Sequence, residues 1–175
     1  MTHIRKGRVE DSPGIAHVHV QGWLTTYQGI VPDEVLANLD TERREAFWRQ
    51  TLTDHAETHP LYVAENEQGQ ITGFISGGQE REGSYGYSGE LLAIYLLPEA
   101  RGSGTGRKLV QILVKNLIQL GYDSMLVWVL AQNPACGFYE ALGGQVITEK
   151  SVTMGGKALI EVAYGWENIS QLIQD

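Results

Sequence analysis

The residues best suited to chemistry lie in a glycine-rich turn, Arg101-Gly102-Ser103-Gly104-Thr105-Gly106, which follows the apolar run Leu91–Leu97 and Pro98. This order predicts a strand buried on both faces, then the turn, then an amphipathic helix that ends at Gly121. Amide groups at the start of such a helix can converge on an anion. Glycines let a phosphate approach closely because they have no Cβ. The turn is therefore predicted to bind a phosphate group.

Two better-known phosphate-binding motifs do not fit this spacing. A P-loop requires Lys followed by Ser or Thr after its second glycine, whereas Lys108 lies between Arg107 and Leu109. A dinucleotide-binding turn has the pattern G-x-G-x-x-G near the first strand, whereas the pattern here is G-x-G-x-G well inside the chain. Both motifs are excluded.

Glu90 and Cys136 are candidates for proton transfer and for covalent chemistry. Glu90 opens the apolar strand, where partial desolvation would suit a general base, and Glu80 and Glu82 are second choices for that role. Cys136 lies in the first turn of a short helix predicted between Asn133-Pro134 and Leu142, with Asn133 as its cap. The helix dipole there would favour a thiolate, so a covalent route through this thiol is an alternative.

The pattern Arg101-x-x-Gly104-x-Gly106, after a strand that ends in Tyr-Leu-Leu-Pro, resembles the acyl-CoA-binding signature of the GNAT superfamily of N-acetyltransferases. The segment Asn133–Gly143 resembles the second motif of that superfamily, and the resemblance extends over nearly the whole chain. It implies an enzyme, an N-acetyltransferase that moves an acetyl group from acetyl-CoA to a primary amine of a small molecule or peptide. Attack would be direct, within a ternary complex. The alternative from a different class is a non-catalytic acyl-CoA-binding or regulatory module of the same fold.

The resemblance also implies roles for individual residues. Glu90 lies eleven residues before Arg101, the offset of the catalytic glutamate in the histone-acetylating branch of the superfamily. Tyr139 matches a tyrosine that acts as general acid near the coenzyme sulfur. The coenzyme would contact the strand end, the turn and the helix cap, at Tyr95, Leu96, Leu97, Arg101, Gly102, Ser103, Gly104, Thr105, Gly106 and Asn133.

The acceptor amine is less well defined by the sequence. Trp23 and Tyr27, with Ile30 and Val31 nearby, are expected to line an acceptor cleft, and Tyr85 with Tyr87 could form a lid. The net charge of −8 suits a cationic acceptor such as a polyamine, an aminoglycoside or a protein α-amine. A small amino-acid-like acceptor remains open.

The elements that must position these residues predict an α/β fold. We expect a mixed, mostly antiparallel central sheet of about seven strands with helices on both faces, the GNAT-like acyl-CoA N-acyltransferase fold. The expected elements are a strand at 3–7, a helix from Asp11 to Tyr27, a helical stretch from Pro32 to Leu52 that could break at 38–41, a hairpin of 61–64 and 71–76, and strands at 125–130, 145–152 and 157–166. Residues 1–166 would form a single domain and 167–175 a polar tail.

Composition excludes several classes of protein. A single cysteine allows no disulfide within the chain and favours a reducing compartment. The acidic balance argues against nucleic-acid binding, and the chain has no apolar run of about 18 residues that would span a membrane. We therefore predict a cytoplasmic protein.

No metal is expected. His55 and His59 could share a helix face but lack further ligands. A homodimer is compatible with the fold.

Overall fold

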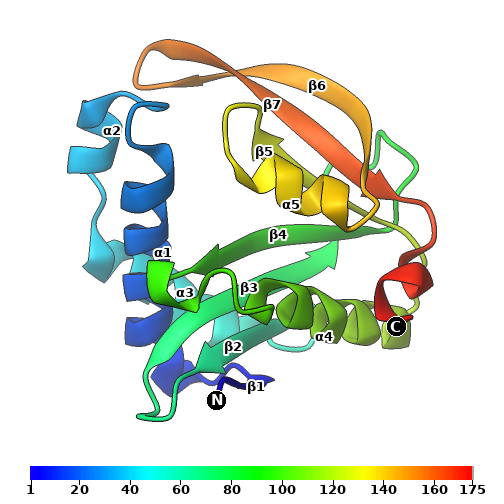
Figure 1. Ribbon diagram of the computed structural model, residues 1–175, viewed down its shortest axis with the longest axis horizontal. Helices are drawn as coiled ribbons and strands as arrows, with labels where there is room; N and C mark the ends of the chain where they lie inside the picture. Colours follow the sequence, from blue (N-terminus) through cyan, green and yellow to red (C-terminus); the bar gives the residue numbers. More distant parts are fainter. Residues whose placement is uncertain (175) are drawn as a thin grey trace.

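A seven-stranded sheet in the order β1-β2-β3-β4-β5-β7-β6 forms the centre of the structure, a computed structural model that describes residues 1–174 (Figure 1). Its strands are β1 (His3–Lys6), β2 (Leu61–Glu65), β3 (Ile71–Gln79), β4 (Gly89–Leu96), β5 (Met125–Leu130), β6 (Gln145–Met154) and β7 (Lys157–Trp166). All neighbouring strands are antiparallel except β4 and β5, which are parallel. The predicted mixed, mostly antiparallel sheet is confirmed.

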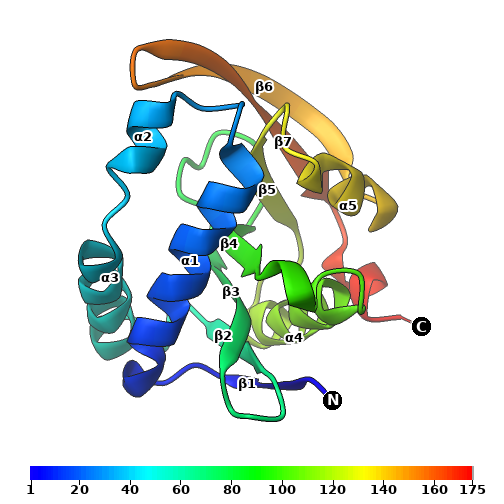
Figure 2. The ribbon, with the colours of Figure 1, turned by 60° about the vertical axis from the view of Figure 1, so that its left-hand side comes forward.

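Helices cover both faces of the sheet, as predicted (Figure 2). They are α1 (Ser12–Tyr27), α2 (Asp33–Ala37), α3 (Thr41–Asp54), α4 (Thr105–Gln119) and α5 (Ala135–Ala141), with short 3-10 turns η1 (Val9–Asp11), η2 (Pro98–Ala100) and η3 (Ile169–Ile173). The predicted break between α2 and α3 is present because the Asp40 carboxylate accepts a hydrogen bond from the amide of Arg43 and starts a new helix. None of the helices within residues 1–174 is long and apolar enough to cross a membrane.

Strands β4 and β5 stay together over a short distance only. Gly89 pairs with Met125 and Glu90 with Leu126, and no further pair follows, while β4 continues along β3 and β5 continues along β7. The two strands therefore diverge after Glu90 (Figure 1). The prediction that Leu91–Leu97 is buried on both faces is wrong beyond Leu91, because residues 92–97 are half-buried beside this opening.

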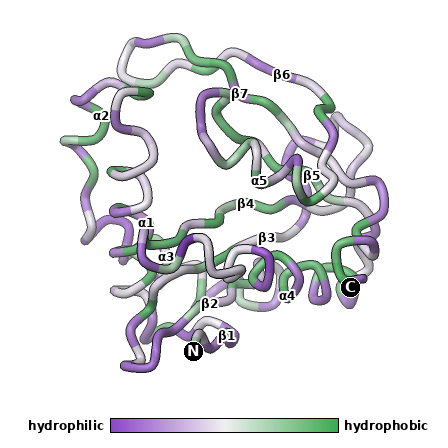
Figure 3. Tube along the Cα trace, viewed as in Figure 1, coloured by the Kyte–Doolittle hydropathy of each residue, from purple (hydrophilic) through white to green (hydrophobic). Residues whose placement is uncertain are grey.

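Apolar side chains pack in three clusters around the sheet. One lies between the sheet and α4, and a second lies under α1 and α3. The hydropathy colouring in Figure 3 shows hydrophobic stretches along β4 and β5 and mostly hydrophilic residues in the outer loops. The third cluster joins the end of α1 and α2 to the β6–β7 hairpin, through Tyr27, Val31, Leu36, Leu130 and Leu159.

The β6–β7 hairpin packs closely on α2 at its tip. A Cβ added at Gly155 would lie only 2.7 Å from Cγ2 of Val35, so the two segments are in tight contact there. Lys157 Nζ also donates a hydrogen bond of 2.9 Å to the carbonyl oxygen of Ile30. These contacts place the hairpin beside the end of α1, next to Ile30, which was expected near the acceptor cleft.

The C-terminal segment is part of the packed structure. Ile169 and Leu172 are buried in the cluster around α4, and the amide of Ile169 donates to the carbonyl oxygen of Asp123 at 3.0 Å. The predicted polar tail at 167–175 is therefore wrong for these residues, since the apolar side chains spaced three apart in η3 turn toward the core. Asp175 lies outside the described residues.

His19 is buried against the second cluster, and the pKa of its imidazole is lowered. Its Nδ1 accepts a hydrogen bond of 3.0 Å from Nε1 of Trp48, and its ring stacks on Tyr95 at 4.9 Å. Burial, with a smaller contribution from the positive charge of Arg44, lowers the pKa of His19 to about 3. In the unfolded chain the pKa is about 6.5. Between these two values the unfolded state binds a proton that the folded state does not, so stability falls as the pH falls.

This arrangement predicts a pH dependence of stability that His19 causes. In denaturant titrations between about pH 7 and about pH 5, we expect the free energy of unfolding to fall by up to about 1.4 kcal/mol per pH unit through this group. The variant His19→Gln lacks the titrating ring. Its free energy of unfolding, which should be lower than that of wild type at about pH 7, should therefore come closer to the wild-type value as the pH falls. Parallel curves for the two proteins would show that His19 is not held neutral by the fold.

Candidate active site

A cavity of about 590 Å³ lies where β4 and β5 diverge. Residues of both strands line it, together with the glycine-rich turn and α5. It brings together many of the residues predicted to be functional, namely Tyr27, Tyr95, Leu96, Arg101, Gly102, Gly104, Gly106, Asn133 and Tyr139. The predicted residues Leu97, Ser103, Thr105, Glu90 and Tyr85 are not among its lining residues.

The glycine-rich turn presents a run of free amide groups. Gly102 and Gly104 have φ angles of 72° and 80°, a left-handed conformation that favours glycine, and α4 begins at the next residue. Within the described residues, the amides of residues 102–107 have no hydrogen-bond acceptor; the first amide of α4 that has one is that of Lys108, which donates to the carbonyl oxygen of Gly104 at 3.1 Å. A Cβ at Gly104 would extend into open space. The turn therefore fits a phosphate or diphosphate group.

Side-chain contacts fix this turn in place. Arg101 donates from Nε to the carbonyl oxygen of Leu96 at 3.1 Å and from Nη2 to Oγ1 of Thr25 at 2.9 Å, which connects the turn to β4 and α1. On the other side, a Cβ at Gly106 would lie 3.3 Å from the ring of Phe138, so α4 packs closely against α5. Sequence reasoning missed Phe138, although it directly precedes Tyr139 in the second motif.

The edge of β4 that faces β5 is open beyond Glu90. Residues 91–96 of this strand line the cavity, while the opposite edge is paired with β3. The amide of Leu97 belongs to the paired side, because it donates to the carbonyl oxygen of Thr72 at 2.8 Å. An extended ligand that contains amides, such as a pantetheine chain, could pair with the open edge in the manner of an added strand.

Polar contacts connect α1 to residues that line the cavity on β4 and just before α5. Trp23 donates from Nε1 to the hydroxyl oxygen of Tyr95 at 3.0 Å. Asn133 donates from Nδ2 to the hydroxyl oxygen of Tyr27 at 3.1 Å, and its Oδ1 accepts from the amide of Ala135 at 2.8 Å. Asn133 was expected to be the N-cap of α5; that position is Pro134, but the Asn133 side chain still accepts from the first amide of the helix and also holds Tyr27 in place.

Tyr139 is a buried phenol that lines the cavity. Its side chain is 4 % exposed, and its hydroxyl has no hydrogen-bond partner within residues 1–174. Burial raises the pKa of Tyr139 well above its ordinary value, with smaller contributions from Tyr27 and Cys136. The phenol therefore keeps its proton at neutral pH and is available as a hydrogen-bond or proton donor.

Glu90 is buried where the strands diverge, but it faces a cation rather than the cavity. Its carboxylate is 2.7 Å from Nη2 of Arg81 and also accepts from Nε and from the main-chain amide of Arg81, both at 3.2 Å. Only 1 % of Glu90 is exposed. Of the second choices, Glu80 is buried and accepts from the amides of Glu82 and Gly83, and Glu82 accepts from Nζ of Lys150 at 2.6 Å.

Cys136 is not activated by its helix. Burial raises the pKa of its thiol, although a hydrogen bond with Tyr164 acts in the opposite direction, and Sγ donates to the carbonyl oxygen of Leu130 at 3.5 Å. Burial therefore opposes the thiolate that the dipole of this seven-residue helix was expected to favour. The geometry gives no support to an acetyl-cysteine route.

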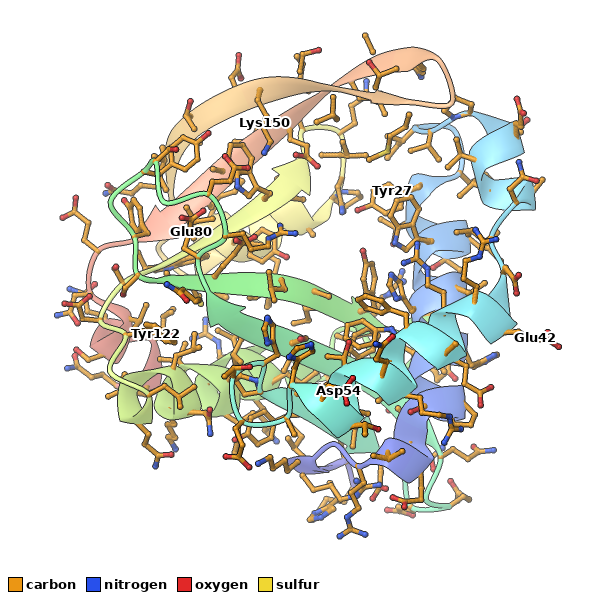
Figure 4. All side chains as sticks on the ribbon, turned by 180° about the vertical axis from the view of Figure 1, so that it is seen from behind. Tyr27, Glu42, Asp54, Glu80, Tyr122 and Lys150 are labelled. Atoms are coloured by element: carbon orange, nitrogen blue, oxygen red, sulfur yellow. The ribbon has the colours of Figure 1, made fainter. Side chains whose placement is uncertain are left out.

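A smaller cavity of about 190 Å³ adjoins the first. The residues common to both linings are Tyr27, Leu92, Tyr95, Trp128 and Val129. The residues that line only the smaller one are Trp23, Arg81, Leu130, Lys150, Met154 and Glu161. Helix α1 provides Tyr27 and strand β6 provides Lys150, both labelled in Figure 4.

The smaller cavity contains some of the residues predicted for the acceptor site and not others. Trp23 and Tyr27 line it, whereas Tyr85 does not; the Tyr85 ring lies 5.5 Å from that of Trp128 in an edge-on contact. Sequence reasoning missed Arg81 and Lys150, since neither belongs to a motif. Trp128 offered one signal, because an indole N–H in an apolar strand needs a partner.

A metal site would require acidic residues, histidines or the cysteine to lie close together. Among the described residues, no group of three or more such side chains is close enough to hold a metal ion. The rings of His55 and His59 are in contact, with their centroids 5.4 Å apart, but neither residue lines a cavity.

Comparisons with known proteins agree with this geometry. The family model of the FR47-like proteins matches residues 81–153. The N-acetyltransferase YuaI of Bacillus subtilis, itself uncharacterized, is 38 % identical over 172 residues, which cover 98 % of this chain and 96 % of YuaI. The L-amino acid N-acyltransferase MnaT of Escherichia coli is 29 % identical over 156 residues, or 88 % and 85 % of the two chains.

A solved structure shows the same fold. The GNAT superfamily phosphinothricin acetyltransferase of Sinorhizobium meliloti, in complex with acetyl-CoA, superposes with a TM-score of 0.72 at 23 % identity. The match covers 94 % of this chain and 87 % of that one. The extent of the match to YuaI, together with this fold and the free amides of the glycine-rich turn, decides the family. This chain belongs to the GNAT superfamily of N-acetyltransferases.

Proposed function

We propose that this enzyme transfers an acetyl group to the primary amine of a small molecule, by direct attack within a ternary complex. The observation that supports this most is the junction of the two cavities at Tyr27, Tyr95 and Trp128. A coenzyme in the larger cavity and an amine in the smaller one would meet there, beside the open edge of β4. Acetyl-CoA supplies the thioester, and the protein supplies alignment and proton transfer.

The coenzyme is proposed to bind mainly through the main chain. The free amides of residues 102–107 would hold the pyrophosphate, and those of Ser103 and Thr105 belong to this run although their side chains bond to each other. The open edge of β4 at Tyr95 and Leu96 would pair with the pantetheine chain, with Leu97 and Arg101 fixing the end of that strand. Asn133 would contact the same chain from the start of α5.

Tyr139 is proposed as the general acid. Its hydroxyl keeps its proton and has no partner among the described residues, so it can donate to a thiolate as that group leaves. It lines the larger cavity on the side of α5.

Glu90 is proposed as the general base, acting through water. Its carboxylate is at the point where β4 and β5 part, but its side chain does not line either cavity and Arg81 occupies its near side. A proton from the amine would therefore reach it through a water molecule rather than by direct contact.

A small acceptor fits the second cavity better than a protein tail. Its volume of about 190 Å³ is below the range of about 300–1,000 Å³ of ordinary ligand pockets, and the β6–β7 hairpin, which packs on α2, limits it. The name of MnaT as an L-amino acid N-acyltransferase also supports a small-molecule amine.

The first prediction concerns the glycine-rich turn. Gly104→Val should lower the affinity for CoA by at least about tenfold in calorimetry, because it forces a side chain into a left-handed position and places methyl groups over the free amides. Gly69→Val is the matched control, since Gly69 has a φ of 76° and open space around it, in the β2–β3 turn. Equal CoA affinity in the two variants would contradict a phosphate site at 102–107.

The second prediction concerns the general acid. Tyr139→Phe should lower kcat by about 10²-fold or more and leave CoA affinity within about twofold, because the ring is kept and only the donor is lost. Tyr164→Phe is the control, because its hydroxyl bonds to Glu140 at 2.7 Å and does not line a cavity. A wild-type kcat for Tyr139→Phe would end the assignment.

The third prediction concerns the base. Glu90→Gln should lower kcat by about 10²-fold or more, with little change in CoA affinity. Glu80→Gln provides the comparison, since Glu80 is also a buried carboxylate near the end of β3. If kcat falls in Glu80→Gln rather than in Glu90→Gln, the base has been assigned to the wrong residue.

A further inference from the structure

The polar groups of the smaller cavity are mainly hydrogen-bond donors. Arg81, Lys150 and Trp128 line it, and none of these side chains can accept a hydrogen bond. Resting on the proposed function, we propose that the acceptor carries a carboxylate beside its amine, as an α-amino acid does, and that these three residues bind the carboxylate. They are therefore the specificity determinants of the acceptor site.

Trp128 provides the most direct observation. Its Nε1 is the one side-chain nitrogen or oxygen in residues 1–174 that is buried without a hydrogen-bond partner. A buried donor without an acceptor is costly, so natural structures usually pair such groups with protein, water or ligand. Trp128 lines both cavities at their junction, where the acceptor is proposed to bind. An oxygen of the carboxylate would satisfy this N–H.

Arg81 is oriented by a carboxylate from outside the cavity. Its Nε and Nη2 donate to Glu90, which lines neither cavity. Its Nη1 has no hydrogen bond among the described residues, so the guanidinium keeps donors for a ligand while its pair with Glu90 stays intact. The pair also explains why Arg81 faces the cavity although 65 % of its side chain is exposed.

Lys150 is positioned in a similar way on β6. Its Nζ donates to Oε1 of Glu82 at 2.6 Å and lies 3.9 Å from the centroid of the Trp128 ring. Oε2 of Glu161 is 4.0 Å away on the neighbouring strand. The ammonium is thus held next to the indole, with donors left over for a ligand.

The groups on the lining differ in charge from the protein as a whole. Glu161 is the only acidic residue of the lining, against the two cations Arg81 and Lys150, while Glu90 and Glu82, which pair with these cations, lie outside the lining. A polyamine, which the net charge of −8 would favour, would bring further positive charge next to these groups. An amine with a carboxylate complements them, while the apolar walls at Trp23, Leu130 and Met154 would contact a hydrocarbon side chain.

The test compares amino acids with their uncharged amides. Glycine, L-alanine, L-leucine, L-methionine and L-phenylalanine, each paired with its C-terminal amide, are titrated by calorimetry into the full-length protein saturated with CoA. The same pairs are assayed for thiol release with acetyl-CoA. We expect at least one acid to bind about tenfold or more tightly than its amide, and to be acetylated with a correspondingly higher kcat/KM.

Variants separate carboxylate binding from a structural role. Trp128→Phe removes the N–H and keeps a ring, and Lys150→Gln removes the charge; both should reduce the preference for acid over amide to about twofold or less. CoA affinity should stay unchanged in Lys150→Gln, because Lys150 does not line the larger cavity. Lys115→Gln on the outer face of α4 has the same change in net charge and should keep the full preference.

The outcomes distinguish the proposed carboxylate site from the proposed function, acetyl transfer to an amine. If amides bind as well as acids, if no acid binds, or if the variants weaken acids and amides equally, the carboxylate site is overturned while acetyl transfer to another amine can still stand. If acids bind with the expected preference but no amine in the panel releases thiol, the anion site stands and the proposed function fails.

Discussion

The loss of pairing between β4 and β5 after Glu90 is the constraint on which the site depends. Strand β4 remains bonded to β3 and strand β5 to β7, so neither can move to close the gap without breaking a complete ladder. Main-chain donors and acceptors along the open edge must then find partners outside the sheet, because buried peptide groups without partners are costly. The opening is thus fixed by the sheet itself, and both cavities follow from it.

The two cavities bind their ligands by different physical means. In the larger one, the groups that fit a diphosphate are amides of the chain, which can converge only because Gly102 and Gly104 adopt positive φ. In the smaller one, the polar groups are side chains from separate strands and a loop, among them Arg81, Lys150 and Trp128. A main-chain site tolerates little change in sequence, whereas a side-chain site can be altered one residue at a time. This difference suits a common coenzyme and a variable acceptor.

The same difference explains how much could be predicted from the sequence. The glycine-rich turn, the break before α3 and the succession of strands along the chain follow from local spacing and capping, and the structure has them as expected. The pair of Arg81 with Glu90 joins a loop to a strand end, and Lys150 reaches Trp128 across strand β7, so no local pattern encodes either contact. The packing of Ile169 against α4 could not be predicted for a similar reason, because it depends on the path of the chain after β7.

Arg81 connects the proposed base to the proposed acceptor site. One edge of its guanidinium bonds to Glu90, and its remaining nitrogen is free to meet an anion in the cavity. Because the guanidinium is planar and rigid, an anion bound at the free nitrogen is held at a fixed distance from the Glu90 carboxylate. The amine next to that anion is then also fixed with respect to the base. Correct placement of the acceptor and removal of its proton thus depend on the same side chain.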